Sequence, residues 1–241
     1  MVRRDIAYLD DNLPKHKLDV YRPQGAKQAP VLIFLHGGAW RSGDRGLYTA
    51  LGNRYAHAGI VTVIPSYRLA PADPHPAQVE DTAAAVAWTL KNLERFGGDP
   101  KRVYLAGHSA GGHLAALLAL DGKWLGKHGV QPSALAGVIP MSGVYRVEGF
   151  ERVFPGGEEV RRDASPLTHV HAGAPPFLIT YCQWDYAFLP VQAERLGAAL
   201  RQAGVAVNVV YVPGLGHITE MLNITAPDDP TVKAVLEFIR P

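Results

Sequence analysis

Ser109 lies at the centre of the pentapeptide Gly107-His108-Ser109-Ala110-Gly111, a GxSxG pattern. The apolar run VYLA precedes it and the apolar segment LAALLAL follows it, so the pattern is predicted to form a sharp turn from a strand into a helix. Such a turn strains the backbone at the serine and needs very small residues on either side. This placement favours a nucleophilic serine over the alternative, a small-residue turn that contains a serine by accident.

A nucleophilic serine needs a base, and His217 is the histidine that follows the last predicted strand. It stands in the sequence GLGH, on a loop that can reach the edge of a sheet. Asp185 follows the preceding predicted strand, which gives the chain order serine, acid, histidine. The alternatives are that His217 is a surface histidine and that Asp185 only caps the next helix. Competing acids are either in a charged loop before that strand or after the base: Glu158, Glu159, Asp163, Asp228 and Asp229.

The segment HGGAW follows another predicted strand and exposes backbone N–H groups at its glycines. We expect the amides of Gly37, Gly38 and Ala110 to form an oxyanion hole. The alternative is a glycine-rich turn that requires positive φ. Together these groups predict acyl transfer: Ser109 attacks a carbonyl, His217 moves the proton and Asp185 orients the imidazole.

Six residues flank the catalytic positions in the sequence and are predicted to line the substrate pocket, although each could equally be core. An insertion over residues 144–174 is the one candidate lid, and it is short for a lipase. An accessible pocket of this kind favours small esters, with short-chain or aromatic acyl groups. The six residues are Trp40, His108, Trp184, Tyr186, Phe188 and Ile218.

The elements that must position these groups alternate between short β-rich runs and longer helical patterns, which indicates a mostly parallel sheet with helices on both faces. The first two strands suggest an antiparallel hairpin. The sheet is predicted to have about eight strands, at residues 5–9, 17–21, 31–35, 60–64, 103–106, 135–141, 177–182 and 205–212. Helices are predicted at residues 47–57, 76–96, 114–120, 190–202 and 231–240.

The composition of the 241 residues, with 47% hydrophobic and 19% charged residues, is that of a globular protein, and we expect a single domain over residues 1–241. The net charge of +2, with dispersed Arg and Lys, argues against a nucleic-acid partner. A lone Cys182, no long apolar run and a charged N-terminus favour a cytoplasmic protein with no membrane segment and no disulfide. The pattern predicts neither a metal nor a cofactor, and it leaves a homodimer open.

The segments HGGAW, SYRLAP, HPAQVEDTAAAVAW, GGDPKRVYLAGHSAGGHLAALLAL and DASPLTH resemble small bacterial carboxylesterases of the α/β-hydrolase superfamily. The resemblance runs from about Leu18 to the C-terminus. It lies near hormone-sensitive-lipase-like esterases, feruloyl-esterase-like proteins and kynurenine formamidases, and it implies an α/β-hydrolase fold that hydrolyses esters without a cofactor.

Three departures from that group matter. Ala39 replaces the usual third glycine after the histidine, the N-terminal region is too short for a large cap, and the acid segment reads CQWD instead of the commoner Gly-x-x-Asp. We therefore expect a minimal cap. An arylformamidase that acts on N-formylkynurenine is an alternative function, because it would use the same triad. A hydrolase-like ligand receptor without turnover is a further alternative, although such proteins typically lack a triad member.

Overall fold

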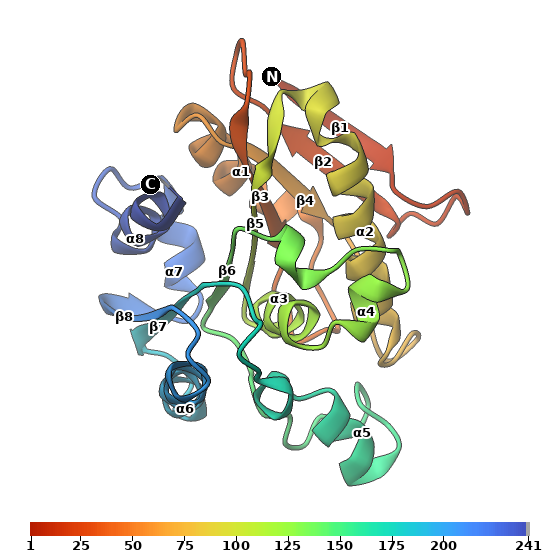
Figure 1. The fold of residues 1–241 in the computed structure, drawn as a ribbon, viewed down its shortest axis with the longest axis vertical. Helices are drawn as coiled ribbons and strands as arrows, with labels where there is room; N and C mark the ends of the chain where they lie inside the picture. The colour runs from red at the N-terminus through yellow and green to blue at the C-terminus, as the bar shows by residue number, and fades with distance from the viewer. Residues whose placement is uncertain (240–241) are drawn as a thin grey trace.

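The computed structural model describes residues 1–239 and contains an eight-stranded sheet with helices on both faces (Figure 1). Across the sheet the strands follow the order β1-β2-β4-β3-β5-β6-β7-β8. The β1–β2 and β2–β4 pairs are antiparallel, and every other neighbouring pair is parallel. The strands are β1 (Val2–Ala7), β2 (Lys17–Tyr21), β3 (Ala29–Leu35), β4 (Val61–Pro65), β5 (Gly98–His108), β6 (Gly137–Met141), β7 (Phe177–Trp184) and β8 (Val207–Gly216).

The helices divide between the two faces of this sheet. In Figure 1, α1, α7 and α8 lie on one side of the sheet, and α2, α3 and α6 lie on the other. Within residues 1–239, each helix is too short or too polar to span a bilayer. The helices are α1 (Thr49–His57), α2 (Ala77–Asn92), α3 (Ala110–Leu120), α4 (Lys123–Gly126), α5 (Gly157–Asp163), α6 (Phe188–Gln202), α7 (Thr219–Leu222) and α8 (Pro230–Ile239).

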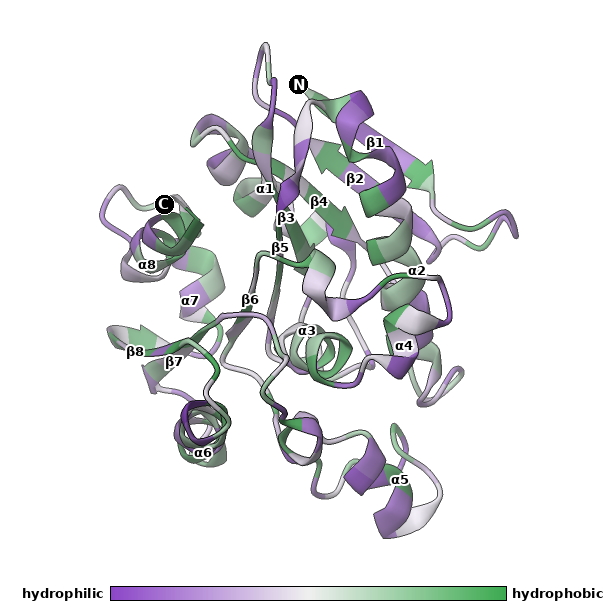
Figure 2. Ribbon diagram, in the orientation of Figure 1, coloured by the Kyte–Doolittle hydropathy of each residue, from purple (hydrophilic) through white to green (hydrophobic). Residues whose placement is uncertain are grey.

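The core has two layers because successive strand side chains point to opposite faces. In β3, Ile33 belongs to the layer under α2, α3 and α6, whereas Phe34 belongs to the layer under α1 and α8. Helix α3 is the most deeply placed helix: all of its 11 residues are buried, and Figure 2 shows it hydrophobic around its circumference. The first residue of α3, Ala110, directly follows Ser109, so the buried helix fixes the backbone next to Ser109.

The predicted elements and their order are confirmed, with shifts at their ends. Strand β5 begins five positions earlier than predicted, at Gly98, because that residue pairs with Ala29 of β3. Helix α2 begins at Ala77, with Pro76 just outside it as the capping residue. The predicted last residue of the final helix, Arg240, lies outside the described residues, and the helix is observed over Pro230–Ile239.

Candidate active site

Ser109 sits at a strained turn between β5 and α3. Its backbone has φ 55° and ψ −116°, in the positive-φ region that non-glycine residues rarely adopt. The turn is held on both sides, since the Ser109 N–H donates to the Met141 carbonyl at 2.9 Å and its carbonyl accepts from His113 at 3.0 Å. A Cβ added at Gly111 would lie 2.0 Å from the Leu35 carbonyl oxygen. The absence of a side chain at Gly111 therefore allows the start of α3 to pack directly against the end of β3, which the sharp turn at Ser109 requires.

The structure brings the three predicted catalytic side chains into one hydrogen-bonded line. Nε2 of His217 lies 2.8 Å from Oγ of Ser109, and Nδ1 of His217 lies 2.6 Å from Oδ1 of Asp185. The side chains of His217 and Asp185 are 7% and 0% exposed. The pairing of β7 with β8 continues as far as Trp184 and Gly216, the residues just before Asp185 and His217. Acid and base thus emerge from two adjacent, paired strand ends.

The carboxylate of Asp185 determines which imidazole nitrogen carries the proton. Burial alone would raise the pKa of Asp185, but the hydrogen bond from His217 and the nearby imidazole outweigh burial and lower it. The ionised carboxylate can only accept, so Nδ1 of His217 carries the hydrogen and Nε2 is free to accept the Ser109 hydroxyl proton. The resting geometry therefore has the donors and acceptors that base-assisted attack by Ser109 requires.

Two of the six predicted pocket residues, Trp40 and His108, have side chains that are buried in the interior. Trp40 is 1% exposed: its ring packs against Phe154, and its Nε1 donates to Nδ1 of His113 at 3.1 Å. His108 is 3% exposed, and its Nε2 donates to the backbone carbonyl of His217 at 2.9 Å. Burial lowers the pKa of His108 to about 3, which keeps it neutral. The assignment of both residues to the pocket wall was wrong, because each is buried behind the site.

The other four predicted pocket residues are exposed and lie close to Asp185 or His217 in the chain, and we call them the aromatic rim. Their exposed fractions are 65% for Trp184, 56% for Tyr186, 45% for Phe188 and 58% for Ile218. The Tyr186 ring centre is 4.6 Å from that of His217, and the Phe188 ring stacks on Tyr186 at 6.5 Å. The rim therefore offers apolar surface next to the base.

The predicted oxyanion donors differ in how free they are. The N–H of Gly37 donates to the hydroxyl of Tyr48 at 3.0 Å, so it is already engaged. Among the described residues, the N–H of Gly38 has no hydrogen-bond acceptor, and Ala110 is the first residue of α3, where helix N–H groups have no partner inside the helix. Gly38 and Ala110 are thus the predicted donors whose amides are available to a substrate oxygen. The amide of Gly37 could donate to substrate only after its hydrogen bond to Tyr48 breaks. Nothing in the sequence pattern points to this role of Tyr48.

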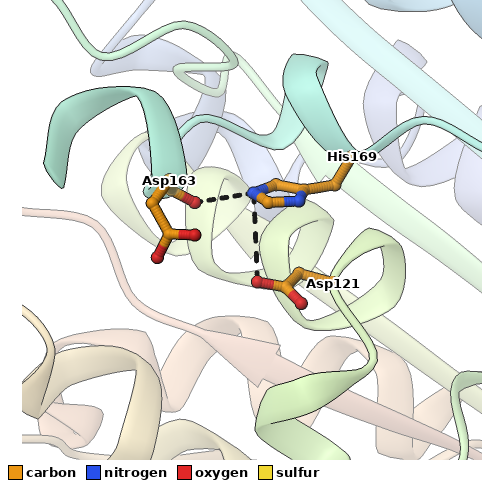
Figure 3. A group of neighbouring side chains, drawn as sticks. All are labelled: Asp121, Asp163 and His169. Atoms are coloured by element: carbon orange, nitrogen blue, oxygen red, sulfur yellow. Dashed lines mark hydrogen bonds and ion pairs between the residues drawn. The ribbon is translucent and has the colours of Figure 1, made fainter. Parts of the chain in front are cut away.

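The predicted lid, residues 144–174, is held at two places: Tyr145 and Arg146 are hydrogen-bonded to Gln192 of α6, and a charged cluster joins the insertion to the end of α3. Figure 3 shows Asp163 and His169 of this insertion beside Asp121, which follows α3. Lys123 reaches both carboxylates, at 2.7 Å from Asp163 and 2.8 Å from Asp121, and Nε2 of His169 donates to the Asp163 carbonyl at 2.7 Å. The group has the ligand types of a metal site, but the Lys123 ammonium already pairs with both carboxylates. It ties the insertion to the end of α3.

Two further buried polar residues lie near the triad and were not singled out from the sequence. Ser142, with φ 46°, directly follows β6. Glu220 comes three residues after His217, in α7, and is 0% exposed. A glutamate three positions after a loop histidine is a weak signal in the sequence, because α7 is too short to be predicted from its periodicity.

Comparison with known proteins supports the fold and the family. Residues 18–140 match the family model BD-FAE. Esterase LipC of Mycobacterium tuberculosis is 34% identical over 98% of this chain and 64% of its own length. Esterase LipQ of the same organism is 31% identical over 92% of this chain and 58% of its own. The thermophilic carboxylesterase EstE1, from a metagenomic library, superposes with a TM-score of 0.82 at 22% identity, covering 100% of this chain and 90% of that one.

The likeness to EstE1 concerns the fold alone, and it confirms the predicted α/β-hydrolase architecture. The chain spans about 64% and 58% of the length of the two mycobacterial relatives, so those proteins contain sequence beyond the matched part. The family model covers more than half of this chain, from β2 to β6, and includes Ser109 and the HGGAW segment. The chain therefore belongs to the BD-FAE family of α/β-hydrolases.

Proposed function

We propose that this chain is a serine carboxylesterase that hydrolyses esters through an acyl-enzyme intermediate. The observation that carries the proposal is the unbroken hydrogen-bonded line from Ser109 through His217 to Asp185. The names of the relatives LipC and LipQ, both called esterases, support the same reaction class.

The proposed mechanism follows from the observed donors and acceptors. Oγ of Ser109 attacks the ester carbonyl while Nε2 of His217 takes its proton, and the N–H groups of Gly38 and Ala110 donate to the oxyanion that forms. The imidazolium of His217, stabilised by Asp185, then gives the proton to the leaving alcohol as the C–O bond breaks. Water attacks the acyl-serine in the same way, and the carboxylic acid leaves.

The aromatic rim supports a proposal about substrate class. The Tyr186 ring lies beside that of His217, the Phe188 ring stacks on it, and such exposed rings favour a small apolar or aromatic substituent. We therefore expect short-chain or aromatic esters to react best. A series of p-nitrophenyl esters of increasing acyl length measures this, and a preference for long acyl chains would contradict it.

The reaction class is tested with Ser109→Ala, which removes the nucleophile at a position whose neighbours are already small. Hydrolysis of p-nitrophenyl acetate should fall by about 10⁵-fold or more, and labelling by a fluorophosphonate should disappear. Ser133→Ala, at an exposed serine after α4, is the matched control and should keep full activity. Full hydrolysis by a folded Ser109→Ala protein would refute the mechanism. Turnover of N-formylkynurenine in preference to esters would instead indicate a formamidase.

A further inference from the structure

A second buried carboxylate lies under the proposed triad. Glu220 is 0% exposed, and three hydroxyl groups donate to it. Oγ of Ser142 is 2.8 Å from Oε2, and Oγ1 of Thr180 and Oγ1 of Thr231 are 3.1 and 3.2 Å from Oε1. These donors come from the end of β6, from β7 and from α8, so the carboxylate joins three elements at one point.

Donation by three hydroxyl groups is an arrangement suited to an ionised carboxylate. Each donor fills a lone-pair position on Glu220, and an ionised carboxylate, which can only accept, satisfies all three at once. Burial and the proximity of Asp185 raise the pKa of Glu220, and the hydrogen bonds from Ser142 and Thr180 oppose that rise. A buried polar group with this many partners is a fixed part of the frame around it.

One route connects Glu220 with His217, and a second connects it with Asp185. Nε2 of His108 lies 3.8 Å from Oε2 of Glu220 and donates to the His217 carbonyl at 2.9 Å, with the two imidazole rings 4.6 Å apart. Oγ of Ser142 also lies 3.9 Å from Sγ of Cys182, whose N–H donates to Asp185 at 3.4 Å. The carboxylate therefore contacts groups that hold the backbone of the base and the loop of the acid.

Resting on the function proposed above, we propose that Glu220 is a positioning residue for the reaction. Through His108 and Ser142 it fixes the loops of His217 and Asp185, and its negative charge favours the imidazolium that forms when His217 takes the Ser109 proton. Glu220 does not touch substrate, so its contribution is to the step that charges the imidazole.

Several titratable groups face this carboxylate and must be considered with it. They are Tyr55 of α1, His108 of β5, Tyr145 after β6, and Cys182 and Asp185 at the end of β7, whereas α8 contacts the carboxylate through the neutral Thr231. Burial raises the pKa of the Tyr55, Tyr145 and Cys182 side chains and lowers that of His108, so each is neutral near pH 7. Glu220 and Asp185 are then the carboxyl groups of this set that can place a negative charge near His217.

The decisive variant is Glu220→Gln, which keeps the shape and removes the charge. We expect kcat to fall about tenfold with KM within about twofold, and the acidic limb of the kcat/KM profile to move about one unit toward lower pH, because the imidazolium loses a stabilising charge. Glu220→Asp should restore the position of that limb. Glu237→Gln, at an exposed glutamate of α8, should match the wild type in both respects.

An NMR titration of the His217 imidazole in the same variants gives a readout that does not depend on turnover. It should show the same downward displacement in Glu220→Gln, so the positioning role can be tested even if the esterase proposal fails. An unmoved titration and an unmoved acidic limb in a folded Glu220→Gln protein would overturn the inference. If that variant does not fold, Ser142→Ala removes the shortest hydrogen bond to the carboxylate, and it should lower kcat severalfold; an unchanged kcat would overturn the inference as well.

Discussion

The groups proposed to do the chemistry and the groups proposed to recognise the substrate are built in opposite ways. Asp185 and His217 are almost entirely buried, and each is held by hydrogen bonds. The aromatic rim is about half exposed, with the Tyr186 ring tilted against that of His217 and stacked on Phe188. The proposed reaction therefore depends on fixed geometry, whereas recognition depends on side chains that can adjust to different esters. Changes in the buried part should cost orders of magnitude, and changes in the rim only small factors.

The largest of the effects that test this contrast is expected from Asp185→Asn. The amide keeps the size of the carboxylate but can donate to Nδ1 of His217, which favours the wrong tautomer and leaves the imidazolium without its counter-charge. We expect kcat for p-nitrophenyl acetate to fall about 10⁴-fold. Asp228→Asn, at an exposed aspartate after α7, is the control and should retain activity. A loss smaller than about tenfold would mean that the acid is not part of the mechanism.

Gly111→Ala tests how tightly the buried part is packed. The added methyl would stand 2.0 Å from the carbonyl oxygen of Leu35, a backbone atom that cannot move aside without shifting β3. We expect the free energy of unfolding to fall by about 3 kcal/mol, measured by urea denaturation. Gly126→Ala, whose added methyl meets nothing within 4 Å, should change it by less than about 0.5 kcal/mol. Equal effects of the two changes would show that the turn has room to relax.

Lowering the pH should decrease the stability of the folded protein, because some of its buried histidines are held neutral. Burial lowers the pKa of His113 to about 3 in the folded protein, well below the unfolded value of about 6.5. As the pH falls from 6.5 toward 3, the unfolded chain binds a proton that the folded chain does not, so stability decreases by up to about 1.4 kcal/mol per pH unit for this residue.

Urea unfolding at pH 7.5 and pH 5 measures this loss of stability. His113→Gln should reduce the difference between the two free energies of unfolding, and His57→Gln, at an exposed histidine of α1, should leave it unchanged. The same pH dependence in both variants would show that His113 titrates normally in the folded protein.

The smallest effects should come from the rim. Tyr186→Ala removes a ring that lies tilted beside His217 and stacks on Phe188, and it should raise KM for aromatic esters about three- to tenfold with kcat changed less than about threefold. Tyr211→Ala, a tyrosine of β8 that is 49% exposed and outside the rim, is the matched control. If Tyr186→Ala lowered kcat by orders of magnitude, the division between chemistry and recognition would fail.

The sequence predicted the elements of the fold and the residues that meet at Ser109, because both produce strong patterns. Strands that are buried on both faces read as continuous apolar runs, and parallel strands place the residues after their carboxyl ends at one edge of the sheet. Asp185 and His217 could therefore be proposed from their positions after two strands, without any knowledge of side-chain direction.

Side-chain direction is the information that the sequence lacks, and the differences from prediction arise there. Trp40 and His108 are next to reactive segments in the chain, but each points into the interior, where a buried acceptor fixes its ring nitrogen. The engagement of Gly37 with Tyr48 likewise depends on how a short 3₁₀ turn over Arg45–Tyr48 folds back on the HGGAW segment. Contacts between segments of this kind have no periodic pattern.

The pairing of Trp184 with Gly216 has a consequence for how the site moves. Because β7 and β8 are still paired where Asp185 and His217 begin, the acid and the base belong to one two-stranded ribbon. Ser109 belongs to β5, which is separated from that ribbon by β6. We therefore expect twisting of the sheet to change the distance from serine to histidine more than the distance from histidine to aspartate. Heat or pressure should therefore abolish hydrolytic activity before the protein unfolds, because Ser109 moves away from a His217–Asp185 pair that stays intact.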